Sequence, residues 1–138
     1  KLTDTIAENI EDYPCTANFG DAKRNYYKED IYVGYRYFET FAKDKVIYPF
    51  GYGLSYTTFS MESVFAEQKD SIELKTTVKN TGDLAGKEVV QVYIEAPQVA
   101  LDKPARVLAG FAKTKELAPG EMQTVTIPEQ PDIRIAFC

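Results

Sequence analysis

The second half of the chain alternates apolar and polar residues in the way that β-strands do. Between residues 72 and 79, Ile, Leu, Thr and Val alternate with Glu, Lys and Thr, which places the two sets on opposite faces of an extended segment. Four more runs are rich in β-branched and aromatic residues and predict further strands: 58–66, 89–94, 106–114 and 122–127.

Turn residues separate these predicted strands. Asn-Thr-Gly-Asp at 80–83 ends the strand over 72–79. Ala-Pro-Gly-Glu at 118–121 places proline and glycine where a type II turn requires them. Short strands with such punctuation predict an antiparallel β-sandwich.

The first part of the chain is less regular. Residues 1–19 show no sustained periodicity, and Pro14 interrupts them. Residues 31–38 alternate and are rich in Tyr, Ile and Val, so they predict a short strand with rings on both faces. A charged turn is expected at 43–45.

Aromatic rings gather around two glycines in the segment 48–59, YPFGYGLSYTTF. Gly51 and Gly53 predict a tight turn, because glycine adopts backbone conformations that other residues resist. The rings need an apolar environment, which a solvated linker would not give them. We therefore interpret the region as a packed joint between two structural units, the second beginning near Thr57.

The predicted interdomain aromatic joint comprises Tyr35, Tyr37, Tyr48, Phe50, Tyr52 and Tyr56. A carbohydrate-binding role for the same rings is the less favoured interpretation.

Composition narrows the classes of partner. The chain has 138 residues and a formal charge of −5, which argues against nucleic acid and anionic membranes as partners. No apolar run approaches the roughly 20 residues of a membrane-spanning helix. Cys15 and Cys138 have no metal-type spacing and the chain has no histidine, so a zinc site is not expected. Two reduced thiols are favoured over a disulfide between them.

Several segments together resemble one protein family. The segment 48–59 is similar to the one that leads into the fibronectin type III-like domain of glycoside hydrolase family 3 enzymes, the β-glucosidases and their relatives. Other stretches fit the family pattern in the same order: EDIYVGYRYF at 29–38, VKNTG at 78–82, AGKEVVQVY at 85–93, LAGF at 108–111 and LAPGE at 117–121.

The resemblance implies two domains. Residues 1–56 would be the C-terminal tail of an α/β sandwich domain plus the aromatic joint, and residues 57–138 a fibronectin type III-like domain. The implied fold class is mainly β: an immunoglobulin- or fibronectin type III-like antiparallel β-sandwich that follows this tail. In the family, a segment similar to DIRI at 132–135 closes the last strand, after two strands and a loop that are not recognisable here. The domain is therefore expected to be interrupted near 128–131.

The intact enzyme that the resemblance implies is a retaining hydrolase, similar to bacterial β-glucosidases, that removes terminal β-linked sugars. Its catalytic carboxylates lie in parts of the family that match no position here, so no catalytic residue is assigned and this chain alone is expected to be inactive. The adjacent pairs Glu11-Asp12 and Glu29-Asp30 are interpreted as solvated carboxylates, because neighbours along a strand point to opposite faces. No cofactor is implied.

The expected partners are the remaining catalytic domains of the same enzyme and, through the intact enzyme, its carbohydrate substrate. Association into a homo-oligomer stays open, since a sandwich without its closing strands exposes a sheet edge. The alternative function is a freestanding carbohydrate-binding or adhesion module, because immunoglobulin-like sandwiches carry many functions. The aromatic first third argues against that alternative, since it lacks a periodic core of its own.

Overall fold

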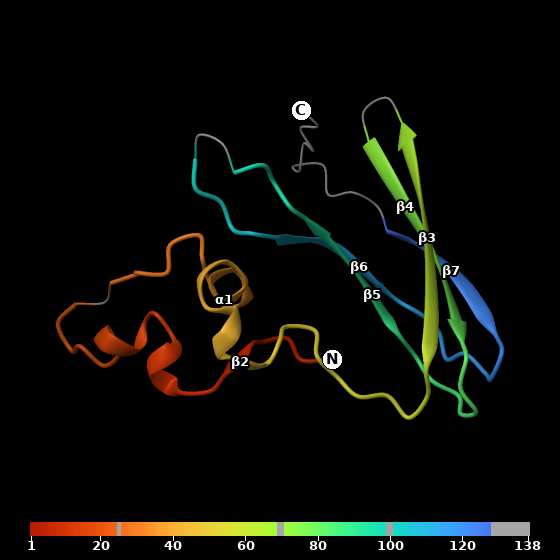
Figure 1. Ribbon diagram of the computed structural model, residues 1–138, viewed down its shortest axis with the longest axis horizontal. Coiled ribbons are helices and arrows are strands. Elements are labelled where there is room, and N and C mark those ends of the chain that lie inside the picture. The colour runs from red at the N-terminus through yellow and green to blue at the C-terminus, as the bar shows by residue number, and fades with distance from the viewer. Residues whose placement is uncertain (25, 69–70, 99–100, 128–138) are drawn as a thin grey trace. The chain divides into compact units, whose positions relative to one another are not determined.

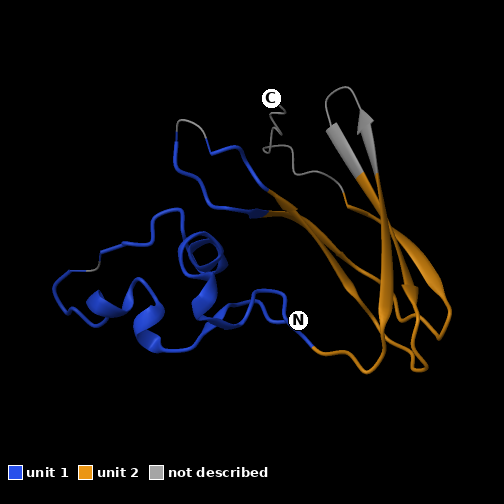
Figure 2. Ribbon diagram, in the orientation of Figure 1, with its two compact units in different colours: residues 1–53, 95–107 blue, residues 54–94, 108–138 orange. Residues whose placement is uncertain are grey.

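The computed structural model describes residues 1–24, 26–68, 71–98 and 101–127. The chain forms two compact units (Figure 2). Unit 1 contains Lys1–Gly53 and Glu95–Val107, and unit 2 contains Leu54–Ile94 and Leu108–Cys138. Residues 95–107 belong to the segment that the sequence assigned to the sandwich, and in the structure they group with unit 1. The division into domains at 1–56 and 57–138 stays a prediction.

Unit 2 is built from antiparallel strands (Figure 1). The strands are β3 (Phe59–Gln68), β4 (Ser71–Asn80), β5 (Val89–Ile94), β6 (Val107–Lys113) and β7 (Met122–Ile127). They form a three-stranded sheet in the order β3-β4-β7 and a two-stranded sheet of β5 and β6. All five predicted strands are thus confirmed, as is the mainly β fold class.

The alternation along β4 sets the core of unit 2. Leu74, Thr76 and Val78 are buried, whereas Lys75 and Lys79, on the opposite face of the strand, are exposed. The apolar core combines residues from both sheets: Leu74, Val78, Val90, Leu117, Val125 and Ile127. Because strands of both sheets bury their apolar faces against one another, unit 2 is a β-sandwich.

The predicted turn at 118–121 is present. The backbone N–H of Glu121 donates to the carbonyl of Ala118 at 2.9 Å, and Gly120 has φ 78°. A type II turn requires this positive φ at its third position, which favours glycine there.

Unit 1 has short elements. They are β1 (Ile6–Ala7), the 3₁₀ helices Ile10–Asp12, Thr16–Asn18 and Lys43–Lys45, the helix α1 (Tyr35–Phe41) and β2 (Val46–Tyr48). β1 and β2 pair antiparallel. The 3₁₀ helix Lys43–Lys45 occupies the position of the predicted charged turn.

The strand predicted over 31–38 is wrong, because α1 begins at Tyr35. Gly34 has φ 58° and ψ −126°, so the chain leaves the extended conformation just before the helix. In the helix, Phe38 lies one turn from Tyr35, and its ring is buried. Both sets of alternating residues in 31–38 contain aromatic rings, so the pattern fits a strand and a helix alike, and tertiary packing decides the element.

Three expectations concern residues outside the described part of the chain: the interruption near 128–131, the closing segment 132–135 and the state of Cys138. Within the described residues, no helix combines the length and apolar character that crossing a bilayer demands.

Candidate functional site: the aromatic joint

The turn after β2 brings four of the predicted joint residues together in two pairs. The rings of Tyr35 and Phe50 lie 4.7 Å apart between centroids, and those of Tyr48 and Tyr52 lie 4.9 Å apart. Both distances fall in the range of favourable aromatic contacts. Tyr35 comes from α1, so the first pair joins the helix to the turn.

Backbone geometry holds this turn in place. Gly51 has φ 81°, and the N–H of Tyr52 donates to the carbonyl of Pro49 at 3.0 Å. The N-terminal segment pairs with the same turn, since the N–H of Gly51 donates to the carbonyl of Leu2 at 2.8 Å. Gly53 allows a close approach, because a Cβ there would lie 3.1 Å from the Cα of Lys1. The tight turn predicted from the two glycines is therefore present.

Tyr37 belongs to a second ring cluster. Its ring contacts Phe38 at 5.3 Å and Phe41 at 5.7 Å. Phe38 also meets the ring of Tyr13 edge-on at 5.2 Å. The Tyr13 hydroxyl accepts a hydrogen bond from the N–H of Ala7 and donates one to the carbonyl of Thr5, each at 3.0 Å.

Sequence reasoning missed Phe38 and Tyr13, which anchor this cluster. The sequence predicts a strand over residues 31–38. In a strand Phe38 and Tyr35 lie on opposite faces, so the helical spacing that places them one turn apart was not considered. Nothing in the local pattern around Tyr13 indicates its partners, which lie at other positions in the fold.

Tyr56 does not join either cluster. It falls in unit 2, and its side chain is 95% exposed. Leu54, two residues earlier, is also almost fully exposed. Tyr48 and Tyr52 retain 43% and 38% exposure despite their mutual contact. The predicted joint is thus partly assembled within unit 1 and partly open to solvent.

A charged cluster fastens residues 95–107 to α1. The Arg106 guanidinium donates a hydrogen bond to the Glu39 carboxylate and forms an ion pair with it. Glu39 also faces Lys43 at 3.7 Å. The N–H of Ala105 donates to the Thr40 hydroxyl at 3.0 Å. Helix α1 therefore binds this segment through two consecutive residues.

Asn80 forms a buried polar centre in unit 2. Its side chain is fully buried and its Oδ1 accepts hydrogen bonds from the Thr57 hydroxyl at 2.7 Å and the Gly82 N–H at 3.1 Å. Its Nδ2 donates to the carbonyls of Leu84 at 2.8 Å and Leu117 at 2.9 Å. The amide is thereby fully satisfied and joins three loops. The sequence indicated only a turn here.

Two glycines make room for Thr57 beside Asn80. A Cβ on Gly82 would lie 2.4 Å from the Thr57 Oγ1, and a Cβ on Gly86 would lie 2.7 Å from its Cγ2. Any larger residue at either position must displace the start of β3. The glycines at positions 82 and 86 therefore allow close packing against Thr57 in unit 2.

The carboxylates of Asp12, Asp30 and Glu121 do not converge on a common site: one caps a helix, one is exposed and one is ion-paired. Asp12 Oδ2 accepts the Asn9 N–H at 3.0 Å and so caps the start of the 3₁₀ helix Ile10–Asp12. Asp30 is exposed. Lys115 and the Ala118 N–H bind the Glu121 carboxylate and hold its pKa below the usual value of 4.5. Among the described residues, no group of three or more metal-binding side chains occurs.

Comparison with known proteins identifies relatives for nearly the whole chain. Residues 88–132 match the model of the fibronectin type III-like domain. A β-glucosidase of Ruminococcus albus is 58% identical over 127 residues, which is 92% of this chain and 13% of that enzyme. β-Glucosidase A of Butyrivibrio fibrisolvens is 53% identical over 146 residues, 92% of this chain and 18% of that protein.

Solved structures give the same result. A β-glucosidase from Paenibacillus barengoltzii superposes with a TM-score of 0.86 and 56% identity, over 94% of this chain and 14% of that one. β-Glucosidase 3B from Thermotoga neapolitana superposes with a TM-score of 0.83 and 44% identity, over 93% of this chain and 19% of that one. The chain thus spans less than a fifth of the length of these relatives.

Proposed function

From the premise that this chain corresponds to the C-terminal, fibronectin type III-like region of glycoside hydrolase family 3 β-glucosidases, we propose that it supports the catalytic domains of a longer enzyme. Its relatives are several times longer, so the partners of this region are the other domains of the same polypeptide. The resemblance found in the sequence is confirmed.

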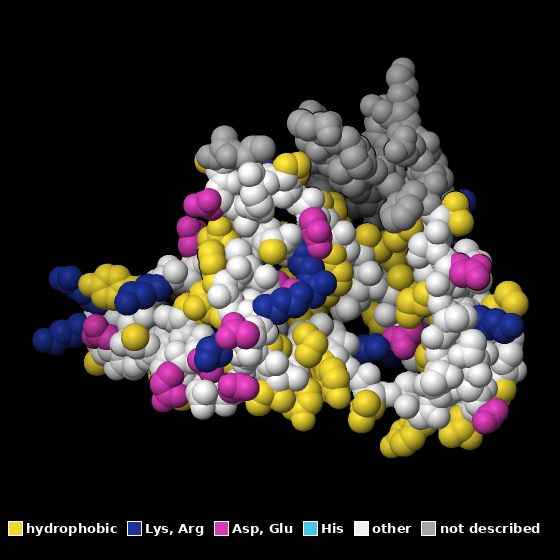
Figure 3. Space-filling model, viewed as in Figure 1, with side chains coloured by type: hydrophobic (Ala, Val, Ile, Leu, Met, Phe, Trp, Pro, Cys, Tyr) yellow, Lys and Arg dark blue, Asp and Glu magenta, His cyan; other side chains and the backbone are white. Residues whose placement is uncertain are grey.

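The observation that carries the proposal is the apolar surface of unit 1. Large apolar side chains remain exposed on it: Leu2, Ile6, Ile10, Phe19, Tyr26, Tyr27, Ile31, Val33, Phe41, Ile47, Tyr48, Tyr52 and Leu101. Figure 3 shows hydrophobic side chains on one face, among charged side chains of both signs. So many exposed apolar residues on a small unit are typical of a surface that another body covers.

The catalytic chemistry belongs to the rest of the enzyme. A retaining glycosidase needs two carboxyl groups on either side of the scissile bond, one as nucleophile and one as acid and base. We propose that both carboxyl groups lie in the other domains of the parent enzyme. The parent enzyme is proposed to remove terminal β-linked sugars with retention and without a cofactor, while this chain alone is inactive.

A chimera tests the supporting role. The matching segment of the Ruminococcus albus enzyme is replaced by this chain, and the chimera is compared with the parent and with a form that lacks the segment. We expect the chimera to hydrolyse 4-nitrophenyl β-D-glucoside like the parent, with a similar Tm. The shortened form should aggregate or melt at a lower temperature, because its apolar contact surface is bare.

Two results would contradict the proposal. One is hydrolysis of the same substrate by this chain alone. The other is a shortened enzyme that matches the parent in both Tm and solubility.

A further inference from the structure

The connection from β5 to β6 leaves the sandwich and belongs to unit 1. Two consecutive residues near its end, Ala105 and Arg106, bind α1 through Glu39 and Thr40. We call these four residues the clasp. Arg106 is followed at once by Val107, the first residue of β6, so one side of the clasp is attached directly to a strand of the sandwich.

The clasp has matched polar groups on its two sides. The Thr40 hydroxyl donates to the Arg36 carbonyl one helical turn earlier at 2.6 Å, and its oxygen accepts the Ala105 N–H at 3.0 Å. The Glu39 carboxylate accepts a hydrogen bond from the Arg106 guanidinium. The segment therefore docks on α1 through hydrogen bonds of defined geometry.

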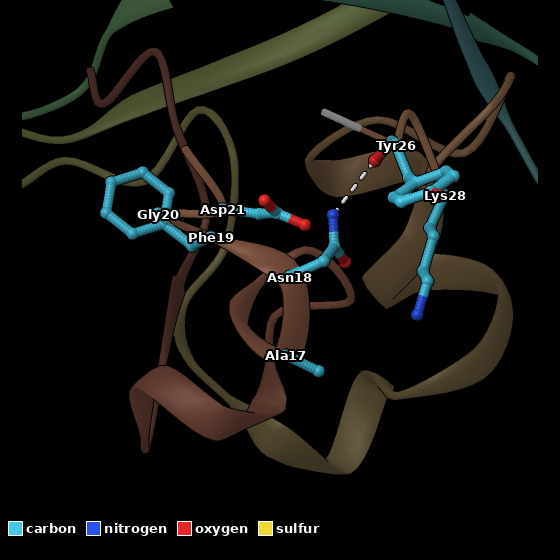
Figure 4. A pocket seen from close by; sticks show the side chains of 7 residues that line it. All are labelled: Ala17, Asn18, Phe19, Gly20, Asp21, Tyr26 and Lys28. Carbon is cyan, nitrogen blue, oxygen red and sulfur yellow. Dashed lines mark hydrogen bonds between the residues drawn. The ribbon is translucent and has the colours of Figure 1, made fainter. Parts of the chain in front are cut away.

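The two sides of the clasp are far apart in sequence. Glu39 and Arg106 are separated by 67 positions. By contrast, the hydrogen bond from the Asn18 amide to the Tyr26 carbonyl, which closes a loop elsewhere in unit 1, spans 8 positions (Figure 4). The entropy lost on closing a loop rises with loop length, so the clasp is costly to form while the chain between its sides is unfolded. Folding of the intervening strands removes most of that cost.

Helix α1 depends on contacts of this kind. It has seven residues, and a helix this short is not stable alone in water. The buried Phe38 supplies an apolar anchor, and the clasp supplies polar contacts to a distant segment. The apolar core of unit 2 contains no clasp residue. Loss of the clasp should therefore loosen α1 before it loosens the sandwich.

We propose that the clasp couples the unfolding of the two units, so that α1 stays folded only while the sandwich holds the start of β6. Unfolding of the sandwich frees Ala105 and Arg106, and the clasp then opens because its closure must restrain a long unfolded loop. This coupling is a property of the chain itself and holds whether or not the chain supports other domains.

Urea denaturation followed by NMR separates the two units in the 138-residue chain. The amide of Ala42, which donates to the Phe38 carbonyl, reports on α1, and the amides of β4 report on the sandwich. In the unmodified chain we expect both sets of signals to be lost with one midpoint. Glu39→Gln/Thr40→Val weakens both polar contacts at nearly constant side-chain volume. In this variant the Ala42 midpoint should fall below the β4 midpoint by about 0.5–1 M urea.

A change in the sandwich core tests whether α1 follows the sandwich. Val125→Ala removes two methyl groups from the core of unit 2, in β7 and outside the clasp. With the clasp intact, the Ala42 and β4 midpoints should fall together. In combination with Glu39→Gln/Thr40→Val, the same change should lower the β4 midpoint alone.

The matched control is Glu116→Gln/Thr126→Val, which makes the same two chemical changes at exposed positions of unit 2. It should keep the α1 and β4 midpoints equal. Should Val125→Ala fail to fold, Ile127→Val replaces it, since it removes one methyl group from the same core. Thr40→Val alone serves if the double clasp variant loses the α1 signals without urea.

Three results would overturn the proposal. The first is separate midpoints for Ala42 and β4 in the unmodified chain. The second is a single shared midpoint in Glu39→Gln/Thr40→Val. The third is a fall of the β4 midpoint alone in Val125→Ala while the clasp is intact.

Discussion

Arg106 is ion-paired with Glu39, a residue 67 positions earlier in the chain. The Glu39 side chain is only 13% exposed and that of Arg106 34%. A pair this far from bulk water is screened less than a surface pair. Together with the hydrogen bond from the Ala105 N–H to the Thr40 hydroxyl, it connects α1 to residues 95–107.

Removing Glu39 should loosen that segment. For Glu39→Gln we expect a loss of about 1–2 kcal/mol in unfolding free energy, because the guanidinium loses its ionic partner. Chemical denaturation measures the loss, and amide hydrogen exchange at Ala105 should accelerate. Lys43→Met is the control: the Lys43 side chain is 78% exposed, so the expected change is below about 0.5 kcal/mol. Equal effects of the two variants would contradict the importance of Arg106.

Asn80 should be among the least tolerant positions of unit 2. Asn80→Ala leaves the buried Thr57 hydroxyl without its acceptor and removes the donor to the carbonyls of Leu84 and Leu117, so we expect a loss of roughly 3 kcal/mol. Asp83→Ala, on the exposed loop that follows, should cost less than about 0.5 kcal/mol. Urea denaturation of both variants makes the comparison, and similar midpoints would refute the buried polar centre.

Gly86 and Thr57 should be coupled. Gly86→Ala places a methyl group against the Thr57 Cγ2, and we expect a loss of about 1–3 kcal/mol from overpacking. Thr57→Ser removes that Cγ2 but keeps the hydroxyl that binds Asn80. The double variant should therefore be less destabilised than the sum of the single variants. Simple additivity in a double-mutant cycle would show that the clash is not with Thr57.

Glu121 should contribute to the acid stability of unit 2. Lys115 and the Ala118 N–H lower its pKa in the folded chain, so its contribution is complete above about pH 4.5 and is lost as the pH falls through the lowered value. Glu121→Gln should flatten the pH dependence of unfolding in that acidic window and leave its slope near pH 7 unchanged. Glu116→Gln, an exposed neighbour, is the control. Identical acid profiles for wild type and Glu121→Gln would rule out this contribution.

Phe50 and Tyr56 should behave differently in the chain and in the chimera. Phe50 packs on Tyr35, so Phe50→Ala should destabilise the chain itself by about 1–3 kcal/mol. Tyr56 is 95% exposed, so Tyr56→Ala should leave the chain unchanged and lower the Tm only in the chimera. Differential scanning calorimetry of both forms makes the comparison. A fall in turnover at unchanged Tm would place these rings in the active site instead.

The strands of unit 2 were predictable because their sequence determines them locally. Along β4, buried residues alternate with exposed or half-buried ones from Leu74 to Lys79, and turn residues follow at once. Helix α1 was not predictable in this way, since the rings before and after Gly34 satisfy a strand pattern as well as a helical one. Its identity depends on Tyr13, which the fold brings to Phe38 from a distant position.

In the candidate site, too, features that depend on local sequence were predictable, and features that depend on distant residues were not. The turn around Gly51 could be inferred from its glycines, whereas the particular ring pairs, Tyr35 with Phe50 and Tyr48 with Tyr52, were not predicted. Asn80 carried no comparable signal, because an asparagine before Thr-Gly is an ordinary turn residue. Its role depends on Leu117, 37 positions later in the chain.

The assignment of residues 95–107 to unit 1 bears on biosynthesis. On the ribosome, Glu39 emerges well before Arg106, and the strands β3, β4 and β5 are made in between. Helix α1 cannot acquire its last partner until most of the sandwich sequence has left the exit tunnel, so unit 1 must mature late although it is translated first. A nascent chain arrested before residue 105 would carry unit 1 in a form that proteases and chaperones can still recognise.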